Sequence, residues 1–373
     1  MLEQSTLGSA EQIPWAKPDF EGNEQEYVSQ ALCSTWISGG PFVKRFEDEF
    51  AKFCGTRFAM TASNGTTALH MAFLALGIGR DDEVVLPGFA FMAAANVALH
   101  LGARPVFAEV DSATWCVNSD TIERVLSPKA KLVVPIHTYG GVCAMDEIMD
   151  LAKRRNLLVL EDAAEALGSR YRGQPVGSFG LSGTFSFHAT KTITTGEGGM
   201  VVTSSPDVQD RMFLFRNHGM RRTRYWHEVP GHNFRLTNIQ AAIGCAQLER
   251  VEDIIRERRR VYASYRKFLS TIDGITLQAF HADAEPLVWT VAVKLKPEAY
   301  PQGRDEVMRQ LLEANIETRN GFFSASMLPH LYGNNHLPVC EELSRHVISL
   351  PTYCSLQDSH IQYICSTLDH LRK

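Results

Sequence analysis

The chain has 373 residues, of which 45% are hydrophobic and 21% are charged, and its formal net charge at pH 7 is −5. These values exclude an intrinsically disordered chain, and they give no basic surface of the kind that binds nucleic acid. The length predicts one large domain with a smaller one attached, which we place at residues 1–250 and 251–373.

The N-terminal stretch MLEQSTLGSAEQIPW has neither the basic start nor the apolar core of a signal peptide. No stretch reaches the roughly 20 consecutive apolar residues that a membrane helix requires. We therefore expect a cytoplasmic protein without a membrane or nucleic-acid partner. The eight cysteines form no CxxC pair, which favours buried thiols over disulfides or a metal site.

From residue 57 onward, short β-rich runs alternate with helical stretches. Strands are expected at 57–63, 82–88, 104–110, 130–140 and 157–166, and helices at 65–77, 91–103 and 145–156. The strands are continuous apolar runs, which is typical of strands covered by helices on both faces. The order predicts a mostly parallel, doubly wound α/β sheet.

The second half of the chain adds two strands, GTFSFH and GMVVTSS, and then a long helical pattern over 237–269. A strand at 287–296, a helix at 304–315 and a strand at 347–351 predict a small C-terminal α+β domain. In open α/β sheets the ligand binds beyond the carboxyl ends of the strands, so the loops at that edge are where we look for a site.

Lys191 follows the strand GTFSFH and precedes a Gly-Glu-Gly-Gly turn at 196–199. A lysine at such a position is usually a solvated surface charge. Here its small and polar neighbours leave space around the amine. A lysine whose pKa is lowered by its surroundings can form a Schiff base with an aldehyde, so Lys191 is a candidate for covalent chemistry.

Asp162 ends the apolar run LLVLED. A carboxylate at the end of a buried strand is costly to remove from water unless it has a cationic partner. It either caps the segment that follows or pairs with a protonated pyridine nitrogen, which would keep the ring able to accept electrons.

The turn SNGTTAL, residues 63–69, lies between a strand and a helix. Its backbone N–H groups and the helix dipole form an anion site, with the hydroxyls of Thr66 and Thr67 as added donors. It lacks the GxGxxG motif and is too short for a Walker loop, so a single phosphate fits best.

Phe91, near the next helix start, is either a core residue or a platform for a flat ring. Pyridoxal 5′-phosphate (PLP) satisfies these positions together with Lys191 and Asp162.

Five motifs together resemble the sugar aminotransferases of the DegT/DnrJ/EryC1/StrS family: SNGTTALHMAFLALGIGRDDEVVLPGFAF, VVPIHTYG, LEDAAEALGS, GTFSFHATKTITTGEGGMV and HNFRLTNIQAAIG. The resemblance covers nearly the whole chain. It implies fold type I of the PLP-dependent transferases, which is aspartate aminotransferase-like. It also implies L-glutamate as amino donor, pyridoxamine 5′-phosphate as the form of the cofactor that carries the nitrogen, and a homodimer with shared active sites.

The resemblance implies a role for each matching position. Lys191 would bind the aldehyde and move a proton between cofactor and sugar. Asp162 would pair with the ring nitrogen, and Glu165 would lie near the ring hydroxyl. The remaining cofactor contacts would be Gly65, Thr66 and Ser186 at the phosphate, Phe91 on the ring face, and Asn233 reaching the phosphate from the neighbouring subunit.

Contacts with the substrate are expected from several loops. The candidates are Trp36, Ile37 and Ser38 in an N-terminal loop, together with His188, His218, Tyr225 and Arg319. Ordinary loop packing explains each of these residues equally well, because aromatic and basic side chains often fill such turns.

A branch of the family carries histidine in place of the lysine and performs 3-dehydration, so Lys191 favours transamination. Among the aminating branches, LEDAAEALGS and YWHEVPGHNFRLTNIQAAIG most resemble the one that aminates C4 of GDP-4-keto-6-deoxy-D-mannose, forming GDP-perosamine for surface polysaccharide. His188-Ala189-Thr190 departs from the expected aromatic-Gly-Asn. Amination at C3 or C4 of a dTDP- or UDP-linked sugar therefore stays open, as does a non-catalytic regulatory role on the same fold.

Overall fold

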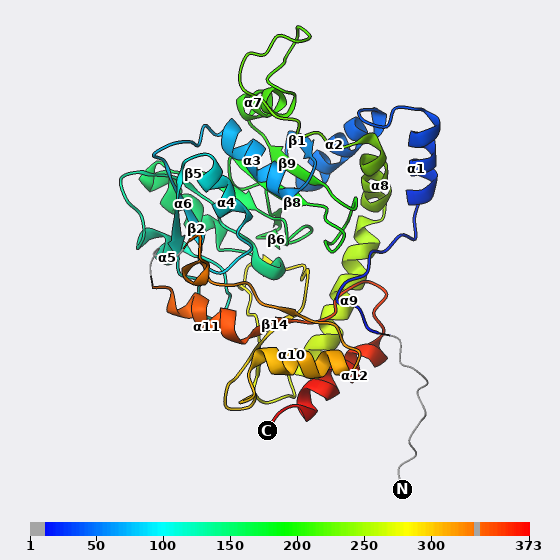
Figure 1. Ribbon diagram of the computed structural model, residues 1–373, viewed down its shortest axis with the longest axis vertical. Coiled ribbons are helices and arrows are strands. Elements are labelled where there is room, and N and C mark those ends of the chain that lie inside the picture. The colour runs from blue at the N-terminus through cyan, green and yellow to red at the C-terminus, as the bar shows by residue number, and fades with distance from the viewer. Residues whose placement is uncertain (1–11, 332–335) are drawn as a thin grey trace.

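A seven-stranded sheet forms the centre of the larger part of the molecule in the computed structural model, which describes residues 12–331 and 336–373 (Figure 1). Its strand order is β1-β9-β8-β5-β4-β2-β3. The strands are β1 (Phe58–Ala62), β2 (Glu83–Pro87), β3 (Arg104–Ala108), β4 (Ala130–Val133), β5 (Leu158–Asp162), β8 (Ser182–Ser186) and β9 (Gly199–Thr203). Neighbours are parallel except at β9, which runs antiparallel to β1 and β8. The mostly parallel α/β sheet predicted from the sequence is confirmed.

Helices connect and cover these strands. They are α1 (Glu24–Cys33), α2 (Pro41–Cys54), α3 (Gly65–Ala75), α4 (Ala93–His100), α5 (Ser119–Glu123), α6 (Met145–Arg155), α7 (Pro206–Arg216) and α8 (Asn238–Glu249). The start of α3 is fixed by a capping box, in which the side chains of Asn64 and Thr67 each accept a hydrogen bond from the other residue's backbone N–H.

Alternation along β8 separates a core face from a cavity face. The ring centroids of Phe185 and Phe187 lie 5.0 and 5.3 Å, respectively, from the ring centroid of Phe50 in α2. Ser186, between them in sequence, points to the other side of the strand and lies beside Gly65 at the start of α3. The apolar face anchors the strand, and the small polar face leaves room near its carboxyl end.

The helix predicted over 237–269 is in fact two helices, α8 and α9 (Val251–Leu269). They are separated at Arg250, whose φ of −103° and ψ of 10° lie outside the helical range. Helix α8 is buried on most sides against α1 and α2, whereas α9 is amphipathic and continues into the smaller part of the molecule (Figure 1). The break allows each helix to turn its buried face towards a different core.

The smaller part contains an antiparallel sheet in the order β10-β12-β14-β13. Its strands are β10 (Ile275–Leu277), β12 (Ala292–Leu295), β13 (Arg319–Asn320) and β14 (Val347–Ser349), and its helices are α10 (Arg304–Glu313), α11 (Pro338–His346) and α12 (Asp358–His370). Three two-residue strands, β6 (Arg170–Tyr171), β7 (Gln174–Pro175) and β11 (Ala284–Glu285), form a separate small sheet, and η1 (Thr138–Gly140) and η2 (Ala325–Met327) are 3₁₀ turns.

The strand predicted at 287–296 is shorter than expected, because only residues 292–295 pair as β12. The N–H of Leu287 donates to Ser169 Oγ, and the N–H of Trp289 donates to the carbonyl oxygen of Tyr139. These bonds tie the segment before β12 to loops of the larger part. The segment therefore joins the two parts and does not extend the small sheet.

A second hydrophobic core lies under the small sheet, distinct from the one around the large sheet. Ile13 belongs to this second core and pairs with Ile316 in an isolated bridge. In contrast, Cys340 and Leu343 of α11 pack with the first core. The chain thus passes between the two cores at several places besides α9.

Seven of the eight cysteines are buried as free thiols, as expected, whereas Cys33 at the end of α1 is exposed. Within the ranges that the structure covers, no helix is long and apolar enough to cross a membrane.

Candidate active site

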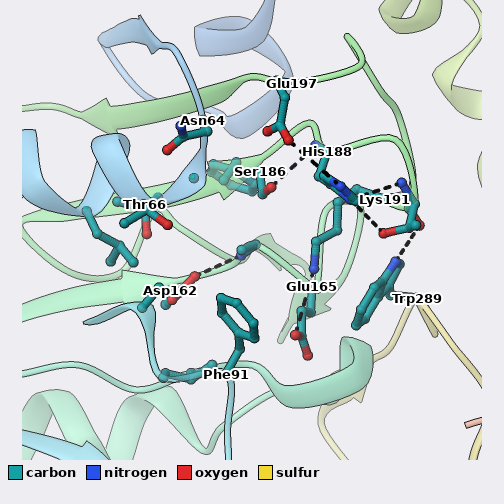
Figure 2. Close-up of a pocket in the computed structure, with 18 of the residues that line it drawn as sticks. Asn64, Thr66, Phe91, Asp162, Glu165, Ser186, His188, Lys191, Glu197 and Trp289 are labelled. Atoms are coloured by element: carbon teal, nitrogen blue, oxygen red, sulfur yellow. Dashed lines mark hydrogen bonds and ion pairs between the residues drawn. The ribbon is translucent and has the colours of Figure 1, made fainter. Parts of the chain in front are cut away.

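A cavity of about 490 Å³ opens where β5, β8 and the start of α3 meet. Its volume lies within the roughly 300–1,000 Å³ typical of small-molecule sites. Eight residues predicted from the sequence line it, namely Gly65, Thr66, Phe91, Asp162, Glu165, Ser186, His188 and Lys191. Figure 2 labels all of these residues except Gly65 and shows their side chains converging from separate elements at the carboxyl edge of the sheet.

Lys191 is enclosed by this cavity, and its side chain is only 13% exposed. Its Nζ lies 3.7 Å from Glu165 Oε1 and 3.5 Å from the centre of the Trp289 indole ring. Burial lowers the pKa of the Lys191 amine, while the carboxylates of Glu165 and Asp162 act in the opposite direction. The amine is therefore deprotonated more readily than that of a surface lysine, as nucleophilic chemistry requires.

Two adjacent carboxylates at the end of β5 have different surroundings. Glu161 accepts backbone N–H bonds from Gly177, Phe179 and Gly180 at 2.6–2.8 Å. Asp162, 5% exposed, accepts one backbone bond, from Ala164 at 3.1 Å. Among the described residues, no side chain donates to its carboxylate or lies within ion-pair distance of it.

This difference marks Asp162 as the carboxylate that lacks a partner. Burial raises the pKa of Asp162, although the N–H of Ala164 and the charge of Lys191 partly oppose the effect. A cation placed beside it in the cavity would restore the lost solvation. A protonated ring nitrogen is such a cation.

Glu165 is held by the loop that follows β4. Its Oε2 accepts the backbone N–H of Tyr139 at 2.8 Å, and Tyr139 has a left-handed φ of 58°. Burial raises the pKa of Glu165, against the opposing charge of Lys191. The carboxylate is thus fixed on one side by the backbone and faces the lysine amine on the other.

The start of α3 forms a recess suited to an anion. Gly65 is its first residue, and a Cβ added there would lie 2.9 Å from the Cβ of Ser186. Any other residue would fill the space beside the serine hydroxyl and the free N–H groups of the first helical turn. Thr66 lines the cavity, but Thr67 does not, because its hydroxyl is used in the capping box. The expectation that Thr67 is a donor in the site is therefore wrong.

Phe91 and His188 lie at the more open side of the cavity. Phe91 is 63% exposed, which is unusual for a core residue and leaves its ring free for a ligand to stack against. His188 Nδ1 lies 3.0 Å from Thr190 Oγ1, and its Nε2 lies 3.9 Å from the carboxylate of Glu197.

Trp36, Ile37 and Ser38 do not line this cavity. They form the exposed loop between α1 and α2, whose backbone carbonyls accept bonds from Asn238. Arg319 also lies outside the cavity, on β13, where it pairs with Glu317 at 2.5 Å. The structure of one chain does not bring these candidates to Lys191.

His218, Tyr225 and Asn233 belong to a segment that follows α7 and extends from the body of the molecule (Figure 1). None of them lines the cavity of its own chain. Tyr225 is 73% exposed, and Asn233 pairs with Asn217 at the base of the segment. The predicted role of Asn233 concerns the cofactor site of a neighbouring subunit, and those of His218 and Tyr225 concern the substrate; all three stay predictions.

The lining residues that were not predicted include Glu197, Trp289 and Phe322. Glu197 lies in the turn that was noted beside Lys191, so its position in the sequence could have indicated it. Trp289 and Phe322 come from the smaller part of the molecule and lie in apolar stretches that carry no chemical motif. Only the folded contacts between the two parts bring them to the cavity.

The site fits PLP on its own chemistry. It combines a buried lysine amine, a carboxylate without a cationic partner, a helix start with a recess for an anion, and an exposed ring face. Within residues 12–331 and 336–373, no group of three or more His, Cys, Asp or Glu side chains is arranged to hold a metal ion.

A model of the DegT/DnrJ/EryC1/StrS aminotransferase family matches residues 18–369. The chain belongs to this family. GDP-perosamine synthases of Escherichia coli O157:H7 and Caulobacter vibrioides (strain ATCC 19089 / CIP 103742 / CB 15) are each 40% identical to it, over 361 and 365 residues; each match covers 96% of this chain and 98% of the relative. The PLP-form of the putative sugar aminotransferase Spr1654 from Streptococcus pneumoniae superposes with a TM-score of 0.90 at 25% identity, covering 96% of this chain and 98% of that one.

Proposed function

We propose that the protein transfers an amino group from L-glutamate to C4 of GDP-4-keto-6-deoxy-D-mannose, with PLP as cofactor and a homodimer as the working unit. Membership of an aminotransferase family supports the class of reaction. The observation that carries the proposal is the buried Lys191 amine, which lies in one cavity with the unpaired carboxylate of Asp162 and the recess at Gly65.

When bound, PLP supplies an aldehyde that accepts amines and a ring that takes up electrons. Lys191 would hold the aldehyde, and Asp162 would hold the ring nitrogen in its charged form. Ser186, Thr66 and the first N–H groups of α3 would bind the phosphate, and Phe91 would cover one ring face.

The freed Lys191 amine would serve as the proton carrier. In the first half of the reaction its Nζ would take the proton from the α-carbon of glutamate and pass it to the cofactor carbon that carries the nitrogen. In the second half it would move a proton from that carbon to C4 of the sugar. Its low exposure keeps bulk water away from that proton. Glu165, fixed by the N–H of Tyr139, would orient the amine between transfers.

The choice of substrate is supported by the relatives named above, two of which are GDP-perosamine synthases similar over nearly their full length. Amination of C3 or C4 of dTDP- or UDP-linked keto sugars is the competing outcome. The alternative from a different class of function is a non-catalytic regulatory protein with the same fold.

The covalent part of the proposal is tested by borohydride reduction of the PLP-loaded protein, followed by peptide mapping. The label is expected on Lys191 and absent from Lys191→Ala. A label on another lysine, or none, would show that the site has been assigned wrongly.

The substrate is tested with a panel of GDP-, dTDP- and UDP-linked keto sugars and ¹⁵N-glutamate. Mass spectrometry reads nitrogen incorporation, and NMR reads its ring position. The expected result is incorporation at C4 of the GDP sugar. Incorporation only into another nucleotide sugar would correct the substrate, and incorporation into none would favour the non-catalytic alternative.

A further inference from the structure

Trp289 contacts the reactive amine from the smaller part of the molecule. The Nζ of Lys191 lies 3.5 Å from the centre of its indole ring, and Glu165 Oε1 lies 3.7 Å from the same Nζ (Figure 2). The amine therefore lies between a carboxylate and an aromatic face. A cation over the face of Trp is stabilised by the ring quadrupole, and more strongly where water is excluded.

The indole is fixed in place by its own bonds. Trp289 Nε1 donates to the carbonyl oxygen of Thr190 at 2.7 Å, and Thr190 immediately precedes Lys191. The ring is 7% exposed, stacks near-parallel to Tyr139 and meets Trp15 edge-on at 5.7 Å. The ring position is thus set relative to the backbone that carries the lysine.

Arg258 of α9 ties the same two residues together. Its Nη1 donates to the carbonyl oxygen of Trp289 at 2.8 Å, and its Nη2 donates to that of Lys191 at 3.3 Å. The guanidinium is buried, and among the residues that the structure describes no carboxylate lies within ion-pair distance of it. Its bonds with these carbonyls are therefore its main contacts.

We propose that Trp289 is a positioning residue that receives the Lys191 amine whenever that amine is not bonded to the cofactor. The indole face stabilises the charged amine and keeps it within the cavity, and the bonds from Trp289 to Thr190 and from Arg258 keep face and amine aligned. The free amine would then stay close to the reacting carbons between the two halves of the reaction.

This proposal rests on the proposed function in one respect, that Lys191 is the reactive amine. Its test uses neither cofactor nor substrate, so either proposal can fail without the other. The charged groups that act on the amine are Glu165, Asp162 and Arg258, and all three are left unchanged.

The test is competitive labelling of the full chain, freed of cofactor, with trace acetic anhydride over a range of pH. Peptide mass spectrometry gives the pH midpoint for Lys191, with exposed Lys153 as internal reference. Removing the ring in Trp289→Leu removes a stabiliser of the charged amine, so the midpoint should fall by about 0.4–1.5 pH units. Trp289→Phe keeps a ring face, so its Lys191 midpoint should lie between that of Trp289→Leu and that of the unchanged protein.

Trp15→Leu is the matched control, because Trp15 packs against Trp289 but does not line the cavity. It should lower the melting temperature and leave the Lys191 midpoint unchanged. A midpoint in Trp289→Leu that is unchanged or raised, or one that falls equally in Trp15→Leu, would overturn the proposal and leave Trp289 as a packing residue only.

Discussion

At the scale of single residues, β5 carries two neighbouring carboxylates with opposite tasks. Glu161 is satisfied by three backbone N–H groups and by His137, both side chains being fully buried. Asp162 faces the cavity with one backbone bond. Because side chains alternate along a strand, one residue supports the fold of the following turn while the next is left available to a ligand.

Asp162→Asn keeps the size of the side chain and removes its charge. We expect kcat to fall by at least about 100-fold, the effect of losing one preorganised charge where charge develops during the reaction. Steady-state kinetics with glutamate and the sugar substrate measures it, and a folded variant is confirmed by circular dichroism. A loss below tenfold would mean that Asp162 does not keep the ring charged.

Glu161→Gln is the control for that change, since it alters the adjacent carboxylate on the opposite face of the strand. It weakens charge-assisted bonds to Gly177, Phe179 and Gly180, so thermal stability should fall while kcat per folded molecule stays within about threefold of the unchanged enzyme. Similar losses of kcat in both variants would point to general damage to β5.

Local sequence was enough to single out Lys191 and Asp162 as candidates, because each ends or follows an apolar strand where a charge needs an explanation, and both line the cavity. It could not predict Trp289, whose neighbours in sequence are apolar and whose contact with Lys191 depends on how the two parts of the molecule meet. Thr67 was misassigned because a hydroxyl in a helix start serves capping and ligand binding equally well, and only the hydrogen bonds distinguish the two.

At the scale of elements, helix α3 packs in the core of the larger part, and its first turn forms the anion recess of the cavity. Gly65→Ala adds a Cβ that would lie 2.9 Å from the Cβ of Ser186. We expect the dissociation constant for PLP to rise by about tenfold or more, with some loss of thermal stability, because the added methyl group fills the anion recess and forces Ser186 or the start of α3 to shift. Gly79→Ala, where the added Cβ meets open space, should change neither quantity. Unchanged PLP affinity in Gly65→Ala would place the phosphate elsewhere.

The same helix carries an acid-sensitive residue. Burial, with the nearby His232 and His100, lowers the pKa of His70 from 6.5 to about 4. The folded state therefore keeps His70 neutral, while the unfolded chain binds a proton below pH 6.5. Stability present above that pH should be lost progressively as pH falls from about 6.5 to about 4.

Urea unfolding at several pH values tests this expectation. The difference in midpoint between pH 7 and pH 4.5 should be smaller in His70→Gln than in the unchanged protein. His360→Gln on the exposed face of α12 should retain the full difference. If the urea midpoint fell equally between pH 7 and pH 4.5 in all three proteins, the loss of stability in acid would be due to other groups.

Strands were predicted well because buried parallel strands are short apolar runs bounded by Gly, Pro or charged residues. The predictions failed where contacts with distant segments determine the bounds of a helix or strand. The break at Arg250 reflects two cores that lie on different sides of one long helical pattern. Leu287 and Trp289 lie outside the strand because their N–H groups donate to Ser169 and to Tyr139. Periodicity along the chain contains neither piece of information.

At the scale of the whole molecule, the segment after α7 presents large aromatic side chains to solvent. Tyr225 and Trp226 are 73% and 68% exposed, and neither lines the cavity. Large exposed aromatic side chains of this kind mark an interaction surface. The predicted homodimer would cover them and would bring Asn233 to the phosphate of the neighbouring site.

Shared sites have a consequence that co-expression can measure. Lys191→Ala and Asn233→Ala would each impair both sites of a homodimer. In a mixed dimer, one site would carry both changes and the other would carry neither, provided that Asn233 acts across the interface. Random mixing of equal amounts should therefore restore about one quarter of the unchanged activity, from the intact sites of the mixed dimers. If Asn233 acted within its own chain, each site of a mixed dimer would carry one change, and activity would stay at the level of the separate variants.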